Sequence, residues 1–234
     1  MIGYSTGIFF KSSISLKTQV KKIAQSKATV IEIMLGEPSD LEEALLLNME
    51  DLDQFRHISI HSPSKNITYS EHSTDFIKQL HMLHTKLNAA YTVFHPDIIE
   101  SISPIMNIFE GSAAIENMDV RKEFGKTALE LSPLLEAYSD LKFVCDLNHI
   151  FSIDPSMELL KETEERFISR LVAYHVSGYV GPEMPHTELM GNDALKQLSF
   201  IKKDVPIIHE GLFTQGKLND ELNLIEKHIH VETN

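Results

Sequence analysis

The chain of 234 residues has a single cysteine and no long uninterrupted apolar run. Because a disulfide needs two cysteines, Cys145 excludes an internal bridge, and we expect a reducing, cytoplasmic location. A membrane-spanning helix needs roughly 18 to 20 apolar residues, so no membrane association is expected. The chain opens directly into the strand-like MIGYSTG, without the basic and apolar segments of a secretory signal.

Positive charge is also scarce. The 21 lysines and arginines face 34 aspartates and glutamates, which gives a formal net charge of −13. Non-specific affinity for nucleic acid depends on an extended basic face, so this composition disfavours extended nucleic-acid binding. A small local basic patch is still compatible with it. We expect a small-molecule partner, and the sequence leaves the oligomeric state open.

What the chain does have is a repeat of short apolar runs and longer amphipathic stretches. Eight short runs begin near Ile2, Val30, His57, Tyr91, Ser112, Lys142, Leu171 and Val205. Strands that alternate with helices imply parallel pairing through right-handed crossovers, and eight such units close a barrel. An open doubly wound sheet would favour G-x-G-x-x-G after the first strand, and the segment Gly3–Gly7 lacks that spacing. The sequence therefore predicts a single (β/α)8 TIM barrel, one domain over residues 1–234.

The amphipathic stretches predict where the helices lie. They cover Leu16–Ser26, Asp40–Met49, Thr74–Leu87, Lys126–Tyr138, Ser156–Thr163, Asn192–Ile201 and Asn219–His228. The unit that begins near Tyr91 is the shortest and has no clear helix. The segment Ser177–Gly191 is the longest loop, and in a barrel it lies over the active-site rim.

Six of the apolar runs stop at a residue type that binds metals. They are ISIHSP at His61, YTVFHP at His95, SAAIEN at Glu116, KFVCDLNH at Asp146, VAYHVS at His175 and PIIHEG at Glu210. Parallel strands end at one rim of a barrel, so these endings would gather imidazole nitrogens and carboxylate oxygens around one point. Side chains alternate faces along a strand, which turns Asp146 inward and Cys145 outward, into the core.

The carboxylates support a metal site independently. Glu116, Asp146 and Glu210 would be costly to bury unpaired, and no lysine or arginine ends a neighbouring strand. A bound metal ion would therefore supply the counter-charge that lysine or arginine does not. Mixed imidazole and carboxylate donors favour Zn²⁺ first and Mn²⁺ second. The roles of two neighbouring residues, Glu32 and His209, are left open by the sequence. Glu32 either joins the ligands or supports one from behind, and His209 either touches the site or is structural.

With its residues in this order, the chain resembles the xylose isomerase-like TIM-barrel superfamily, which includes endonuclease IV enzymes and sugar isomerases and epimerases. The resemblance covers nearly the whole chain. It rests on His61 in HSPS, His95 in FHPD, Glu116 in IENMD, Asp146 and His149 in DLNH, His175 in YHVSG, His186 in PHTEL and Glu210 in HEG.

The resemblance to endonuclease IV implies a site for two zinc ions, with a third position less complete. The first ion would be held by His61, His95 and Glu116. Glu116 would bridge to a second ion, held also by Asp146, His175 and Glu210. A third ion would use His149 and His186, but Met184 stands where the family has aspartate, with Glu183 as a substitute. Ser64 also replaces the family's aromatic residue and the DNA-facing loops are less basic, which does not favour DNA repair.

The first functional hypothesis is a metal-dependent hydrolase of the phosphoesterase type. Two metals would activate a hydroxide for attack on a phosphate ester or phosphodiester. Glu116, Glu210 and His149 are the catalytic candidates, and His149 and His186 would stabilise the leaving oxygen. The rim cations Lys65, Arg121 and Lys122 would hold remote phosphates, or else they are ordinary surface charge.

The alternative is an isomerase or epimerase of a keto sugar or hydroxy-carbonyl compound. One divalent metal, held by Glu116, Asp146, His175 and Glu210, would polarise the substrate while the two glutamates exchange a proton. The arginine that epimerases commonly carry shortly after the seventh-strand histidine is missing here. A third hypothesis is a non-catalytic barrel that keeps a structural metal site or uses its cavity for binding, but structural zinc sites are closed and four-coordinate, and the donors here are too many. We favour the hydrolase because His61 and His95 have no evident role in a one-metal isomerase.

Overall fold

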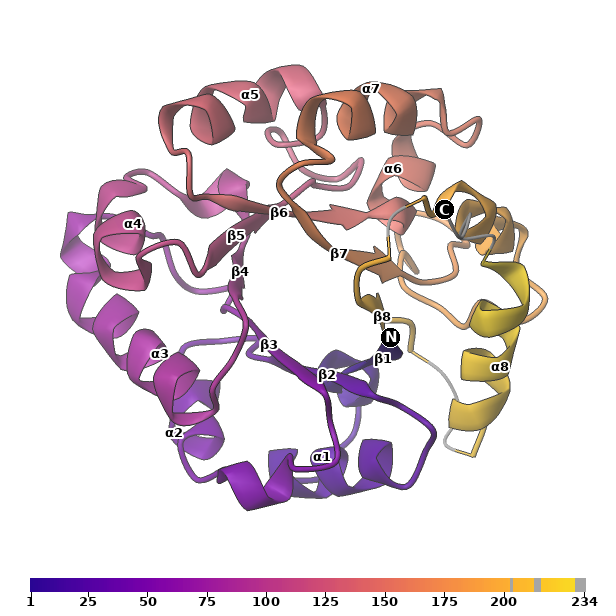
Figure 1. The fold of residues 1–234 in the computed structure, drawn as a ribbon, viewed down its shortest axis with the longest axis horizontal. Coiled ribbons are helices and arrows are strands. Elements are labelled where there is room, and N and C mark those ends of the chain that lie inside the picture. Colours follow the sequence, from indigo (N-terminus) through magenta and orange to yellow (C-terminus); the bar gives the residue numbers. More distant parts are fainter. Residues whose placement is uncertain (203, 213–215, 230–234) are drawn as a thin grey trace.

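The computed structural model describes residues 1–202, 204–212 and 216–229, and it confirms the predicted barrel. Eight parallel strands pair in chain order, and β8 closes the sheet against β1 (Figure 1). The strands are β1 Ile2–Ser5, β2 Val30–Met34, β3 His57–His61, β4 Thr92–Phe94, β5 Ala113–Glu116, β6 Lys142–Asp146, β7 Leu171–Val176 and β8 Ile207–His209.

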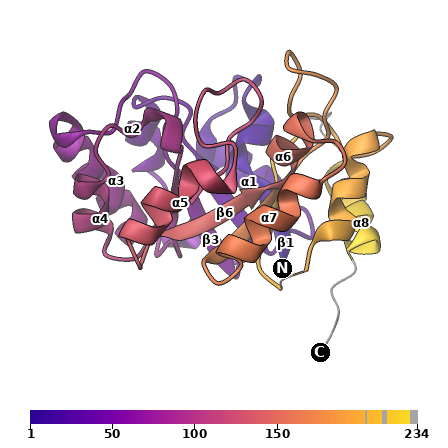
Figure 2. The ribbon, with the colours of Figure 1, turned by 90° about the horizontal axis from the view of Figure 1, so that it is seen from above.

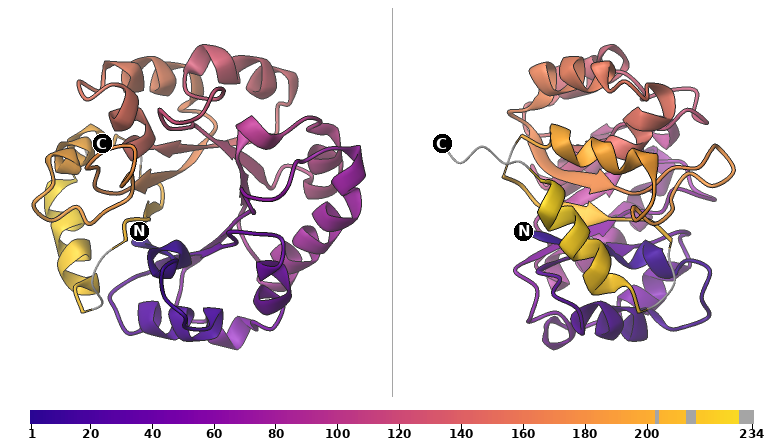
Figure 3. Two further views of the ribbon diagram at one scale, coloured as in Figure 1. Left: turned by 180° about the vertical axis from the view of Figure 1, so that it is seen from behind. Right: turned by 90° about the vertical axis from the view of Figure 1, so that its right-hand side faces the viewer.

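Helices surround the barrel on all sides (Figures 1 and 3). They are α1 Leu16–Ala24, α2 Asp40–Ala44, α3 Thr74–Lys86, α4 Ser103–Phe109, α5 Ala128–Ala137, α6 Leu147–Ile153, α7 Glu158–Phe167 and α8 Leu218–His228. Within the described part of the chain, no helix combines the length and the apolar character needed to cross a membrane.

The helix predictions need three corrections. α2 ends at Ala44, five residues before the predicted end. The stretch predicted as a helix over Asn192–Ile201 forms 3₁₀ turns over Asp193–Phe200, which Asn192 caps through its side chain. α4 and α6 were not predicted. Both have only 7 residues, and five residues of α6 in a row are buried, so no amphipathic period marks it.

Two hydrophobic cores follow from the alternation of side chains along the strands. The smaller fills the barrel and contains Val30, Tyr91, Val93, Ala114, Val144, Ala173 and Ile208. The larger lies between the strands and the helices, and it includes Cys145, as its outward phase predicted. A period of two thus sorts each strand into an inner and an outer face.

The inner face continues directly into the candidate site. Most residues of the inner core lie two positions before a candidate donor or Glu32. The pairs are Val30 and Glu32, Val93 and His95, Ala114 and Glu116, Val144 and Asp146, Ala173 and His175, and Ile208 and Glu210. In Figure 2 the amino end of β1 lies at one rim of the barrel, and the loop after β7 rises from the other. The donors therefore stand at the carboxyl-end rim, as predicted.

Candidate metal centre

The first donor cluster joins the ends of three consecutive strands. His61 Nε2 lies 3.1 Å from His95 Nε2 and 3.3 Å from Glu116 Oε2, and His95 Nε2 lies 3.4 Å from the same oxygen. Ligands about 2.0 to 2.1 Å from a tetrahedral zinc ion lie roughly 3.4 Å apart, so this triangle has the size of one face of such a site. His61 Nδ1 donates to the Ser62 carbonyl at 2.9 Å, which leaves Nε2 as the ring nitrogen that faces the cluster.

The second cluster lies beside the first and also includes Glu116. His175 Nδ1 lies 3.2 Å from Glu116 Oε1 and 3.4 Å from Glu210 Oε1, and Asp146 completes the group. Among the described residues, Asp146 Oδ2 and Glu210 Oε1 are buried without a hydrogen-bond partner. Buried carboxylate oxygens without hydrogen bonds need a positive counter-charge. Because these two belong to one cluster, the cluster has the character of a cation site.

Glu116 faces both clusters with one carboxylate. Its Oε2 is toward His61 and His95, and its Oε1 is toward His175. Burial opposes its ionisation, but the neighbouring His175, His61 and His95 outweigh burial and hold the pKa of Glu116 well below its usual range. Glu116 therefore has the geometry and the charge of a carboxylate that bridges two cations.

The other two carboxylates of the site are electrostatically strained without a cation. Burial and the nearby charge of Glu116 raise the pKa of Asp146 well above its usual range. Burial, the largest cause, together with Glu116 and Glu32 raises the pKa of Glu210 to about 8. No lysine or arginine of the described chain forms an ion pair with Glu116, Asp146 or Glu210. The donor set thus fits divalent metal as the counter-charge.

Glu32 lies behind the second cluster. Its Oε1 is 3.4 Å from His175 Nε2, on the side of the ring away from Glu116, and its Oε2 accepts from the Ser59 hydroxyl at 2.8 Å. A carboxylate in this position orients a metal-binding imidazole and strengthens it as a donor. Of the two roles left open for Glu32, the geometry fits support of His175.

A third cluster brings together Asp119, His149 and His186, with their donor atoms within 4.8 Å of one another. The two histidines were candidates from the sequence, and Asp119 was not. Met184, at the position where the resemblance requires aspartate, is 54% exposed, and Glu183 is exposed as well. The carboxylate beside these histidines therefore comes from the loop after β5, where no periodic pattern marks it.

A cavity of about 410 Å³ opens over the clusters. Its lining includes His61, His95, Glu116, His149, His186 and Glu210 and also the three rim cations Lys65, Arg121 and Lys122. The structure thus places the predicted substrate-binding cations beside the donors. Their role in holding substrate stays a prediction.

Each rim cation also has a partner within the protein. Arg121 is paired with Asp119, and Lys122 Nζ lies 2.6 Å from Asp97 Oδ2. The other oxygen of Asp97 is 3.9 Å from His95 Nδ1, so Lys122 helps to hold a carboxylate behind a candidate ligand. Lys65 lies over the Phe10 ring, 4.5 Å from its centre.

His209 points away from the clusters and supports the loops around Glu210. Its Nε2 donates to Glu221 Oε2 at 3.0 Å, while its Nδ1 accepts from the Gly211 backbone at 2.9 Å. Glu221, on α8, also accepts from the backbone of Leu189 and Met190 in the loop after β7. The sequence did not indicate Glu221, although a fully buried glutamate on an amphipathic helix needs such partners.

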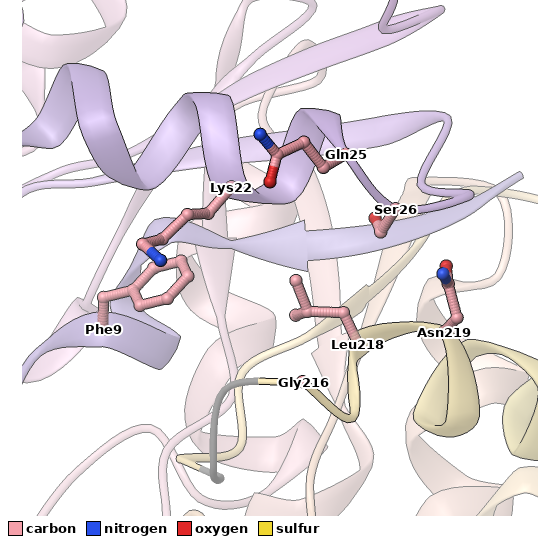
Figure 4. A pocket seen from close by; sticks show the side chains of 7 residues that line it. All are labelled: Phe9, Lys22, Gln25, Ser26, Gly216, Leu218 and Asn219. Atoms are coloured by element: carbon pink, nitrogen blue, oxygen red, sulfur yellow. The ribbon is translucent and has the colours of Figure 1, made fainter.

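A separate pocket of about 210 Å³ lies between α1 and the start of α8 (Figure 4). It is lined by Phe9, Lys22, Gln25, Ser26, Gly216, Leu218 and Asn219. None of these residues belongs to the three clusters, and no histidine or carboxylate is among them. The groups suited to metal chemistry are therefore those at the barrel mouth.

No protein-family model matches this sequence, and no curated protein matches it. Solved structures do match. A D-tagatose 3-epimerase-like protein superposes with a TM-score of 0.72 at 18% identity, over 97% of this chain and 98% of the other. Endonuclease IV from Thermus thermophilus superposes with a TM-score of 0.68 at 14% identity, and the match covers 97% of each chain. A xylose isomerase domain containing protein from Salmonella typhimurium superposes with a TM-score of 0.66 at 14% identity, over 97% of this chain and 96% of the other.

The chain thus has the TIM-barrel fold of these three proteins. Both an epimerase and an endonuclease are among the solved structures that superpose on this chain. At these identities the likeness establishes the fold, and the choice of reaction depends on the site itself.

Proposed function

We propose that this protein is a metal-dependent phosphoesterase that hydrolyses a small phosphate ester or phosphodiester at a multinuclear site. The position of Glu116 supports this proposal most directly, because its two oxygens face two separate donor clusters. His61 and His95 complete the first of these clusters. A site built for one cation has no use for either histidine.

The residues present would divide the work of hydrolysis. Two divalent cations, with Zn²⁺ preferred and Mn²⁺ second, would supply charge for the phosphoryl oxygens and make water nucleophilic at neutral pH. Glu116 belongs to both clusters and would fix the position of one relative to the other. Glu210, whose side chain is 11% exposed at the cavity, is placed to take a proton from the attacking water. His149 is anchored through Nδ1 to the Asn117 carbonyl at 2.7 Å, and its Nε2 would stabilise the leaving oxygen.

Metal content per chain is the decisive measurement. We expect two or more equivalents of metal in protein purified without chelator, one equivalent fewer in His61→Ala, and a larger loss in Glu116→Gln. His72→Ala is the matched control, because His72 is exposed outside the site. A panel of phosphoesters then tests for metal-dependent hydrolysis. One equivalent that His61→Ala leaves in place, or no hydrolysis across the panel, would sink the proposal.

The second cluster supports one alternative, an isomerase or epimerase of a keto sugar or hydroxy-carbonyl compound. Glu116, Asp146, His175 and Glu210 converge as a complete four-residue donor set for a single cation. Glu116 and Glu210 would then exchange a proton with carbon on opposite faces of the substrate. Incorporation of solvent deuterium next to a carbonyl, in the protein with one equivalent of metal, would decide for this function.

A further inference from the structure

A second cavity at the barrel mouth, the side cavity, adjoins the one over the donor clusters and has a volume of about 270 Å³. The two cavities share a wall, so the side cavity opens directly beside the site. That wall is made by Met34, Ser64, Lys65, Arg121, His186 and Glu210. An organic group attached to a phosphoryl group at the clusters can therefore enter the side cavity.

The residues that line the side cavity but not its neighbour carry no charge. They are Ser5, Gly7, Phe10, Gly36 and Leu212. The Phe10 side chain is 60% exposed, and Leu212 is half-buried. A Cβ atom at Gly36 would lie 3.5 Å from the Phe10 ring, so the lack of a side chain there keeps the space beside the ring open. This wall offers apolar surface to an uncharged group.

The charged groups of the side cavity all lie on the shared wall. Lys65 and Arg121 are among them, and Lys65 Nζ is 4.5 Å from the centre of the Phe10 ring. A further cavity, of about 470 Å³, also includes Phe10, and its lining contains the carboxylates of Asp40 and Glu43. A second phosphate group beyond Phe10 would meet these carboxylates. The charges thus favour an ester with one anionic group over a polyanion.

The side cavity has the size of a single ring. An apolar cavity of roughly 150 Å³ is large enough to hold benzene, so about 270 Å³ leaves room for a substituted ring. Aromatic groups also gain from offset or edge-to-face contact with an aromatic wall, and Phe10 provides one.

We propose that the side cavity binds the organic group of the substrate, and that Phe10 and Leu212 select an uncharged aromatic ring there. The substrate class is then a phosphate ester of a single aromatic ring. This inference rests on the proposed hydrolase, because it places the phosphoryl group at the donor clusters.

The test compares phenylphosphonate with methylphosphonate, which carry the same anionic group and differ in the organic group. We expect the zinc-loaded, full-length protein to bind phenylphosphonate about 10-fold more tightly, because only the phenyl group fills the side cavity. Phe10→Ala and Leu212→Ala, on different loops, should each lower this ratio about threefold. Phe124→Ala is the matched control, because Phe124 is an exposed aromatic residue outside both cavities. Isothermal titration calorimetry measures both affinities, and melting temperatures establish that each variant is folded.

The ratio also separates the side cavity from an effect through Lys65. If Phe10 served only to hold Lys65, Phe10→Ala would weaken both phosphonates equally and Leu212→Ala would change neither affinity. That result, or equal affinities of the wild type for the two phosphonates, would overturn the inference.

Failure of this inference is distinguishable from failure of the proposed function. Metal-dependent hydrolysis across the phosphoester panel, with no preference for phenylphosphonate, would exclude the ring-binding role and leave the proposed function intact. An absence of hydrolysis, even with selective phosphonate binding, would remove the proposed function and the substrate class with it.

Discussion

Three of the candidate histidines at the barrel mouth have one ring nitrogen toward the donors and the other toward a protein group. His61 uses the Ser62 carbonyl, His149 uses the Asn117 carbonyl, and His175 faces Glu32. The two carbonyl groups fix a proton on Nδ1 of His61 and His149, so Nε2 is the nitrogen that would bind a cation. The residues around the site therefore matter as much as the donors.

Substitution of Glu32 tests this arrangement without removal of a ligand. We expect Glu32→Gln to weaken cation binding at the second cluster about 10- to 100-fold, because His175 loses the carboxylate behind it. Competition with a chromogenic chelator measures the affinity, and Asp154→Asn is the control outside the site. An affinity equal to that of the wild type would mean that Glu32 has only a packing role.

At the residue scale, the sequence predicted those site residues whose position follows from the period-two alternation of a strand. Five of the six strand-end candidates lie in phase with an apolar residue of the inner face, and His61 shares its face with Ser59. Asp119 lies in a loop, and loop conformation leaves no periodic trace in the sequence. The sequence left two roles open for Glu32. The alternation of side chains along a strand predicts which face a residue is on, but it does not predict the distance from that residue to a neighbour.

Among the elements, α6 shows how a strand end and a helix start can be the same residue. Asp146 ends β6, and its Oδ1 accepts the His149 backbone N–H at 2.8 Å as the cap of α6. The helix therefore begins without a loop and carries His149 over the barrel. Strand starts were predicted to within two residues, because apolar runs mark them. α6 was missed because its buried residues include the polar Asn148 and His149, so no apolar stripe marks the helix in the sequence.

The packing of α3 against β4 gives a pH-dependent prediction. His84 of α3 is buried against Phe109, and its Nδ1 lies 3.1 Å from the Thr92 hydroxyl. Burial, and then the proximity of His81, lower the pKa of His84 from 6.5 to about 4. The unfolded chain thus binds a proton that the folded protein does not, so stability is full above pH 6.5 and falls as the pH drops toward 4.

We expect this loss to be about 2 kcal/mol in the free energy of unfolding, less than the full shift implies because water reaches part of the ring. His84→Gln cannot take up the proton and should lack this component. Urea unfolding of both proteins, each with a chelator present, between pH 6.5 and pH 4 measures the difference. Parallel curves for the two proteins would contradict the prediction.

For the whole molecule, the barrel mouth contributes to stability only when its charges are balanced. Glu116, Asp146 and Glu210 converge in a buried site, and such carboxylates repel one another without a cation. A cation that binds only the folded protein stabilises it in proportion to the logarithm of its concentration over Kd. Asp146 and Glu210, whose pKa values are raised, therefore destabilise the metal-free barrel when they are ionised.

Removal of metal should lower the melting temperature by about 5 °C or more, since binding at 100 times Kd is worth about 2.7 kcal/mol. Differential scanning calorimetry with and without chelator measures this shift. In Glu116→Gln the shift should be much smaller, because both clusters lose their shared donor. Equal melting temperatures for loaded and chelated wild type would show that the cluster holds no cation under those conditions.

The shared carboxylate of Glu116 also has a thermodynamic consequence. An ion bound beside His61 would fix the orientation of this carboxylate and draw on its charge, so it would change the affinity that the neighbouring position has for its own ion. Reciprocity requires that the second ion change the first affinity by the same factor. Loading of the barrel mouth is therefore cooperative in one sense or the other, and a metal titration should depart from the curve for two independent sites.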